Sequence, residues 1–229
     1  MSAAPVTPVP RAVVFDLDGV LIDSEPLWHE AELEVFCALG VPLTRALCLE
    51  TTGLRVDAVV QHWYGLHPWP HAPHERVAAD VVGRVAALIR ARAQPMPHVH
   101  AALDAVGARG LALGLASSSP MLVIDAALAR LGIARRFSAV RSAEPLPHGK
   151  PDPQVYLLAC ADLGVAPAAA IAVEDSSSGL RAAHAAGMRV IAVPDPSARP
   201  PDALGLADLV IADLGELATA LDRLVAPPR

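Results

Sequence analysis

The stretch RAVVFDLDG, residues 11–19, begins as an apolar run and ends in two acids, Asp16 and Asp18. Its apolar residues are continuous and do not alternate with polar ones, which is typical of a strand buried on both faces of a parallel sheet. Three further runs share this character: LALGLA at 111–116, AAAIAV at 168–173 and RVIAV at 189–193. We therefore expect these four runs to be buried strands of one parallel sheet.

Helical segments separate the later strands. We predict them at 120–131, 153–163 and 177–186, each beginning beside a proline or serine that favours a helix start. Strand and helix alternate in this way from about residue 111 to residue 225. This order predicts an α/β fold with a doubly wound parallel sheet.

A different pattern follows the first strand. Residues 23–95 hold no convincing strand, and five of the chain's eight aromatic residues fall there. Apolar periodicity in this segment predicts helices near 25–39, 43–49, 54–66 and 74–93. Such a segment can build a small core of its own. We therefore expect a helical cap at 23–95, inserted into a core domain formed by residues 1–22 and 96–229.

Charge and composition exclude several classes of protein. The 229 residues carry 18 lysines and arginines against 24 aspartates and glutamates, a net charge of −6, and the basic residues are scattered singly. This distribution argues against nucleic acids and anionic membranes as partners. No apolar run is long enough to span a bilayer, and residues 1–10 lack the features of a secretory signal. We expect a cytoplasmic protein, and we expect a monomer.

Acidic pairs end two of the predicted strands. Asp16 and Asp18 follow the first, and Glu174 and Asp175 follow the run at 168–173. Ligands of such sheets bind beyond the carboxyl ends of the strands, so the four carboxylates should converge there. Grouped carboxylates repel one another and lose hydration, so they need a compensating cation unless each pair merely caps a helix. Oxygen ligands without histidine or cysteine favour Mg²⁺ over zinc.

Two features indicate phosphate binding near the same edge. The strand at 111–116 is followed by three serines, Ser117 to Ser119, whose hydroxyls and backbone N–H groups stand at a helix start, where phosphate is readily held. Lys150 is the one lysine of a chain with 17 arginines. A compact ammonium suits a position among carboxylates and phosphate oxygens.

These segments resemble, in order, the four motifs of the haloacid dehalogenase-like hydrolases. The matching stretches are FDLDGVLIDSE at 15–25, the serine after the strand at 111–116, GKPDPQVY at 149–156 and VEDSSSGLRAAHAAGM at 173–188. The resemblance covers roughly residues 11–223. It includes the insert, which is similar to bacterial phosphatases of hexitol phosphates and 2-deoxyglucose 6-phosphate. The resemblance implies the core fold and the helical cap of this family.

The resemblance also implies chemical roles. Asp16 would be the nucleophile that forms an aspartyl-phosphate. Asp18 would be the general acid for the leaving alcohol and then the base for water. Mg²⁺ would be bound by the Asp16 side chain, the Asp18 backbone carbonyl and Asp175, with Glu174 binding directly or through water.

Further residues would hold the substrate. The phosphoryl oxygens would be bound by Ser117, the backbone N–H of Ser118 and Lys150. In the cap, TGLR at 52–55 matches a family loop that touches the leaving group, so Arg55 would contact sugar hydroxyls or a distal anion. Arg55 is equally readable as a solvated helix residue.

The resemblance implies a Mg²⁺-dependent phosphatase of small sugar or polyol phosphates. Two alternatives stay open. The related β-phosphoglucomutases share the nucleophile, the second aspartate, the lysine and the acidic pair, but they have a cap histidine where this chain has Trp28, which favours the phosphatase. A non-catalytic phosphosugar-binding protein is the third hypothesis.

Overall fold

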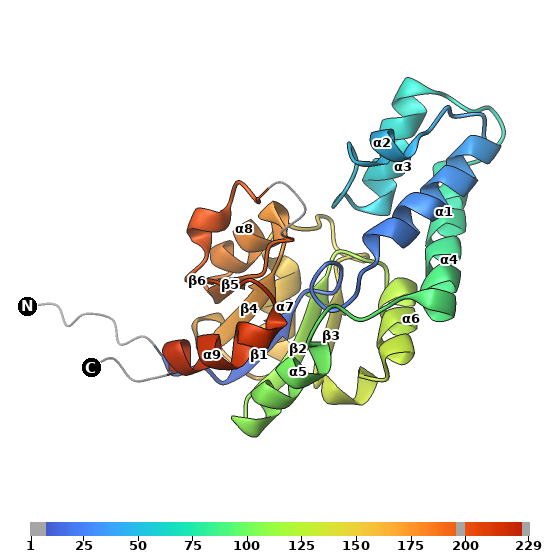
Figure 1. The fold of residues 1–229 in the computed structure, drawn as a ribbon. Coiled ribbons are helices and arrows are strands. Elements are labelled where there is room, and N and C mark those ends of the chain that lie inside the picture. Colours follow the sequence, from blue (N-terminus) through green and yellow to red (C-terminus); the bar gives the residue numbers. More distant parts are fainter. Residues whose placement is uncertain (1–7, 196–199, 226–229) are drawn as a thin grey trace, which may run out of the picture.

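A computed structural model describes residues 8–195 and 200–225 of the chain. In these residues six parallel strands form one sheet in the order β3-β2-β1-β4-β5-β6 (Figure 1). The strands are β1 (Ala12–Phe15), β2 (Ala112–Ser117), β3 (Ala139–Ser142), β4 (Ala170–Glu174), β5 (Arg189–Ala192) and β6 (Leu209–Val210). The chain runs from β1 outward to β2 and β3, and then returns to the other side of β1 with β4. This reversal confirms the predicted doubly wound α/β fold.

Helices cover both faces of the sheet because alternate residues of each strand point to opposite faces. Val13 and Phe15 of β1 belong to one buried apolar cluster, which includes residues of α5 (Val99–Ala108), α6 (Met121–Leu131) and α9 (Leu217–Val225). Ala12 and Val14 belong to a second cluster with α7 (Gln154–Asp162) and α8 (Ser177–Ala185). Burial on both faces explains why the central strands have continuous apolar sequences.

Four helices lie between β1 and α5 in the sequence. They are α1 (Glu25–Ala38), α2 (Arg45–Cys48), α3 (Val56–Leu66) and α4 (His74–Arg92). They gather beyond the carboxyl end of β1, where α4 packs against α1, α3 and α6 (Figure 1). Their apolar residues belong to the same buried cluster as one face of the sheet.

The segments through which the chain enters and leaves this helical region run side by side and are joined by backbone hydrogen bonds. Asp23 N donates to Gln94 O at 3.2 Å, and Met96 N donates to Leu21 O at 3.1 Å. The division into a cap at 23–95 and a core stays a prediction. Of the core range, residues 1–7, 196–199 and 226–229 lie outside the described residues.

Four strands and helices were given no range in the sequence analysis: β3, β6, α5 and α9. The strands β3 and β6 lie at the two edges of the sheet and carry partly exposed residues such as Arg141, so they lack a continuous apolar run. Helix α5 has no side-chain cap and begins after His98, whose φ is +65°. Edge strands are commonly short and polar because an exposed apolar edge promotes aggregation.

No helix in the described residues is both long enough and apolar enough to cross a membrane.

Candidate active site

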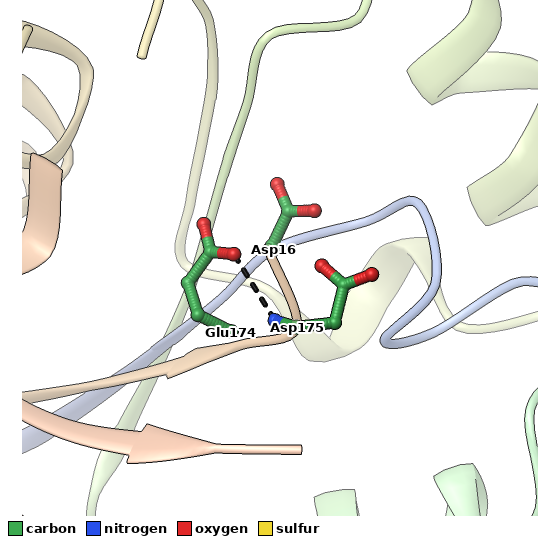
Figure 2. Close-up of side chains that lie close together, drawn as sticks. All are labelled: Asp16, Glu174 and Asp175. Atoms are coloured by element: carbon green, nitrogen blue, oxygen red, sulfur yellow. Dashed lines mark hydrogen bonds between the residues drawn. The ribbon is translucent and has the colours of Figure 1, made fainter. Parts of the chain in front are cut away.

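Neighbouring strands bring three carboxylates together at the carboxyl edge of the sheet. Phe15 of β1 lies beside Val173 of β4, and the next residue, Asp16, donates its backbone N–H to Val173 O at 3.0 Å. Glu174 ends β4 and Asp175 follows it. Oxygens of Asp16, Glu174 and Asp175 lie within 4.8 Å of one another (Figure 2). We call these three residues the acidic trio. They are three of the four carboxylates that were expected to converge, and Asp18 is the fourth.

Lys150 provides the positive charge beside the acidic trio. Its Nζ donates to Asp16 Oδ1 at 2.5 Å, to Glu174 Oε1 at 2.6 Å and to the carbonyl of Ala116 at 2.9 Å. The Tyr156 hydroxyl donates to the same Glu174 oxygen at 2.6 Å. Burial alone would lower the pKa of Lys150, but the charges of Asp16 and Glu174 outweigh it and raise the pKa above its ordinary value. The lysine therefore stays an ammonium.

One ammonium does not balance the three acids. Burial raises the pKa of Asp16 to about 7; the Lys150 charge opposes this rise, and the Glu174 and Asp18 charges add to it. Burial and the charges of Glu174 and Asp16 raise the pKa of Asp175 well above its ordinary value. In the described part of the chain, no side chain donates a hydrogen bond to the Asp175 carboxylate. The site therefore has an excess of negative charge and oxygen donors, which suits a hard divalent cation.

Two glycines leave room for these carboxylates. Gly19 has a φ of +75°, and a Cβ there would overlap Asp175 Oδ2. A Cβ on Gly179 would overlap the carboxylate of Glu174. Glycine is therefore needed at both positions by the close approach of an acid, and at position 19 also by the left-handed backbone.

Asp18 lies beside the acidic trio but its carboxylate is bound by hydroxyl and indole donors. Ser24 Oγ donates to Asp18 Oδ1 at 2.5 Å, and Trp28 Nε1 donates to the same oxygen at 3.2 Å. Ser119 Oγ donates to Oδ2 at 2.6 Å, and Ser117 Oγ lies 3.5 Å from it. The metal role expected for Asp18 concerns its backbone carbonyl and stays a prediction.

The remaining predicted residues face a cavity of about 600 Å³ beside Lys150. Ser118 lines it from the core, and Arg55 lines it from the start of α3. The cavity wall also includes Gly53 and Leu54 from the helical insert and 147–152 from the core. Three of the four predicted substrate residues, Ser118, Lys150 and Arg55, thus line one cavity. The guanidinium of Arg55 itself is hydrogen-bonded to the protein.

Comparison with known proteins agrees with this arrangement. Residues 13–193 match the family described as haloacid dehalogenase-like hydrolase. The chain belongs to this family. It is 44% identical over 214 residues to hexitol phosphatase B of Escherichia coli, covering 93% of this chain and 96% of that protein. The family and the hydrolase class expected from the sequence are therefore confirmed.

Two solved structures have the same fold. CbbY from Rhodobacter sphaeroides, crystallised with phosphate, superposes with a TM-score of 0.81 at 28% identity, covering 91% of this chain and 96% of that one. A Thermotoga maritima protein provisionally assigned as a β-phosphoglucomutase gives 0.74 at 29% identity, covering 93% and 99%.

The family motifs contain contacts that the sequence did not single out. Ser24 and Ser119 bind Asp18, and Tyr156 binds Glu174. Tyr156 had a usable signal, because it is one of three aromatic residues outside the insert and lies in the stretch that carries Lys150. The serines gave no signal of a contact with Asp18, because Ser24 stands at a helix start, where serine is a common cap, and Ser119 was interpreted with its neighbours as a phosphate site.

Proposed function

We propose that this chain is a Mg²⁺-dependent phosphatase that hydrolyses small sugar or polyol phosphates, of the hexitol 6-phosphate or 2-deoxyglucose 6-phosphate type, through an aspartyl-phosphate on Asp16. The observation that carries the proposal is the acidic trio with Lys150 bound to two of its members. The 44% identity to a hexitol phosphatase supports the substrate class.

The acidic trio fits a magnesium ion by its chemistry. All donors are carboxylate oxygens, and the Asp16 and Asp175 carboxyls have raised pKa values that a nearby cation would lower. Asp16, Asp175 and the Asp18 backbone carbonyl would hold the ion, with Glu174 binding directly or through water. When bound, the ion offsets the repulsion between the carboxylates and an incoming phosphate.

Asp16 and Asp18 would perform the two chemical steps. Asp16 attacks phosphorus, the bond from phosphorus to the alcohol oxygen breaks, and protonated Asp18 gives its proton to the leaving alcohol. Asp18 then takes a proton from water, which attacks phosphorus and breaks the bond to Asp16. Inorganic phosphate is released and both carboxyls return to their starting state.

Other residues would position these groups. Lys150 orients Asp16 through a 2.5 Å hydrogen bond and neutralises part of the phosphate charge. Ser117 and the Ser118 N–H would bind phosphoryl oxygens. The helical segment at 23–95 would act as a cap that excludes bulk water from the cavity beside Lys150. A cytoplasmic location and a monomeric state complete the proposal.

A panel of phosphorylated sugars and polyols tests the function. With Mg²⁺ the wild-type protein should release phosphate from hexose or hexitol 6-phosphates, and a chelator should stop the release. Asp16→Asn should abolish it, whereas Asp125→Asn, at an exposed acid of α6, should leave it unchanged. Undiminished turnover by Asp16→Asn would overturn the mechanism.

A phosphosugar mutase is the second candidate, favoured by the fold shared with the Thermotoga maritima protein. The test is incubation with β-glucose 1-phosphate and a trace of the 1,6-bisphosphate. Conversion to glucose 6-phosphate without free phosphate would support the mutase. Free phosphate as the main product would support the phosphatase, and ligand retention without turnover would support a binding protein.

A further inference from the structure

Arg55 connects the helical insert to the core. It precedes the first residue of α3, and its side chain is 21% exposed. Nη1 donates to the carbonyls of Ala143 at 3.1 Å and Leu146 at 2.9 Å, and Nη2 donates to the carbonyl of Glu144 at 3.4 Å. Nε and Nη2 also donate to the two carboxylate oxygens of Asp57 at 3.1 and 3.2 Å. A guanidinium has five N–H donors, so each is engaged with a described residue.

The carbonyls that Arg55 binds belong to a segment close to the chemistry. Residues 143–146 follow β3 and lead within a few residues to Lys150. The contact therefore fixes the start of α3 to the same loop that carries the lysine beside Asp16. A planar, permanently charged fork suits three carbonyls on one turn of backbone, and a lysine could not match this geometry.

Gly149 provides an independent sign that this contact is built into the sequence. A Cβ on Gly149 would lie 2.6 Å from Arg55 Cδ and 3.1 Å from Cγ. The aliphatic stem of Arg55 thus lies directly against the α-carbon of Gly149. The φ of Gly149 is not positive, so its backbone conformation does not require glycine. The Arg55 stem is the closest obstacle to a side chain at this position.

Arg55 also lies between two cavities. It lines the cavity of about 600 Å³ beside Lys150 and a second one of about 500 Å³ between α3, α4 and the start of α6. Asp57 and Ser118 line both cavities as well. The hydrogen-bonded side chain therefore stands where the two spaces adjoin, and breaking its contacts would open one toward the other.

We infer that Arg55 is a positioning residue: it latches the helical insert onto the 143–146 loop and so holds the site closed over Lys150. In this closed form its donors are used by the protein, so the latch replaces the substrate contact expected from the sequence. The inference rests on the proposed function only where turnover is the readout.

Two substrates separate a latch from a ligand. Arg55→Ala should lower kcat/KM by at least about tenfold for hexitol 6-phosphate and by a similar factor for acetyl phosphate, whose leaving group has no hydroxyls, because closure precedes both reactions. Arg55→Lys should not restore activity. A loss confined to hexitol 6-phosphate would overturn the latch and support a substrate contact.

Gly149 gives a second variant. Gly149→Ala should displace the Arg55 stem and cause a loss similar to that of Arg55→Ala. The double variant should be no worse than Arg55→Ala alone, since the new methyl group then has room and the latch is already lost. Losses that multiply in the double variant would contradict the inference.

A distance measurement tests the latch without turnover. One spin label would be placed on the exposed Cys37 of α1, and another on Ala185→Cys at an exposed position of α8; Cys48 and Cys160 are buried. The protein with Arg55 should give a single narrow distance distribution, and Arg55→Ala a broader one that extends to longer distances. Identical distributions would overturn the latch. If the distributions differ but no sugar phosphate is hydrolysed, the proposed function fails and the latch stands.

Discussion

Glu32 makes the stability of the protein depend on pH in a calculable way. This residue of α1 is 6% exposed, and among the described residues its Oε2 has no hydrogen-bond partner. Burial raises its pKa from the ordinary 4.5 to about 7, against a smaller opposing effect of a hydrogen bond with Cys48. Between these values the folded state keeps a proton that the unfolded chain has lost. Stability is therefore lost as the pH rises from about 4.5 to about 7.

The substitution Glu32→Gln removes this dependence. The difference between the two pKa values corresponds to about 3 kcal/mol of destabilisation, fully developed above the folded-state pKa. From about pH 5 to about pH 8, the free energy of unfolding of the variant should rise relative to that of the wild type by most of this amount. The assay is urea unfolding of both proteins at the two pH values.

Glu34→Gln is the matched control because Glu34 lies on the same helix but is exposed. It should shift unfolding by less than about 1 kcal/mol at both pH values. An advantage of Glu32→Gln that is the same at both pH values would refute the reasoning, because it would show that Glu32 ionises alike in the folded and unfolded chains.

Three further outcomes follow from the site. Lys150→Met should abolish phosphate release and, by leaving two buried carboxylates unpaired, cost about 3–5 kcal/mol in urea unfolding; near-normal turnover would contradict the role of the ammonium. Gly179→Ala should displace Glu174 and so weaken Mg²⁺ binding, measured by calorimetry, at least about tenfold. Gly65→Ala, at a glycine with open space around it, should leave Mg²⁺ binding unchanged. Equal Mg²⁺ affinities of the two variants would contradict the placement of Glu174 in the metal site. Tyr156→Phe should cost about 1–3 kcal/mol of stability by removing one donor from Glu174, and no change in unfolding would count against that hydrogen bond.

The central part of the fold could be predicted because its physical cause is visible in the sequence. The runs around Val13 and Ile171 are continuously apolar since helices cover both faces of the sheet. Strands β3 and β6 could not be predicted in the same way, because the two central residues of β3 are partly exposed and β6 has only two residues.

The features of the site likewise divide into those that the sequence could predict and those that it could not. Asp16, Glu174 and Asp175 follow strands whose order fixes their convergence, and Lys150 was marked by the rarity of lysine in the chain. The orientation of Asp18 could not be predicted, because it depends on donors from two separate segments: the start of α1, with Ser24 and Trp28, and the turn after β2, with Ser119. Such contacts are set by tertiary packing, which no local pattern encodes.

The most direct test of the account is to trap the enzyme during turnover and find where phosphate is bound. The sample, mixed with Mg²⁺ and a hexitol 6-phosphate, would be quenched, reduced with borohydride and analysed by peptide mass spectrometry, since reduction converts an acyl phosphate of aspartate to homoserine. The account predicts homoserine at position 16, with aspartate unchanged at position 18. Homoserine at another position, or none in a sample that is releasing phosphate, would contradict it.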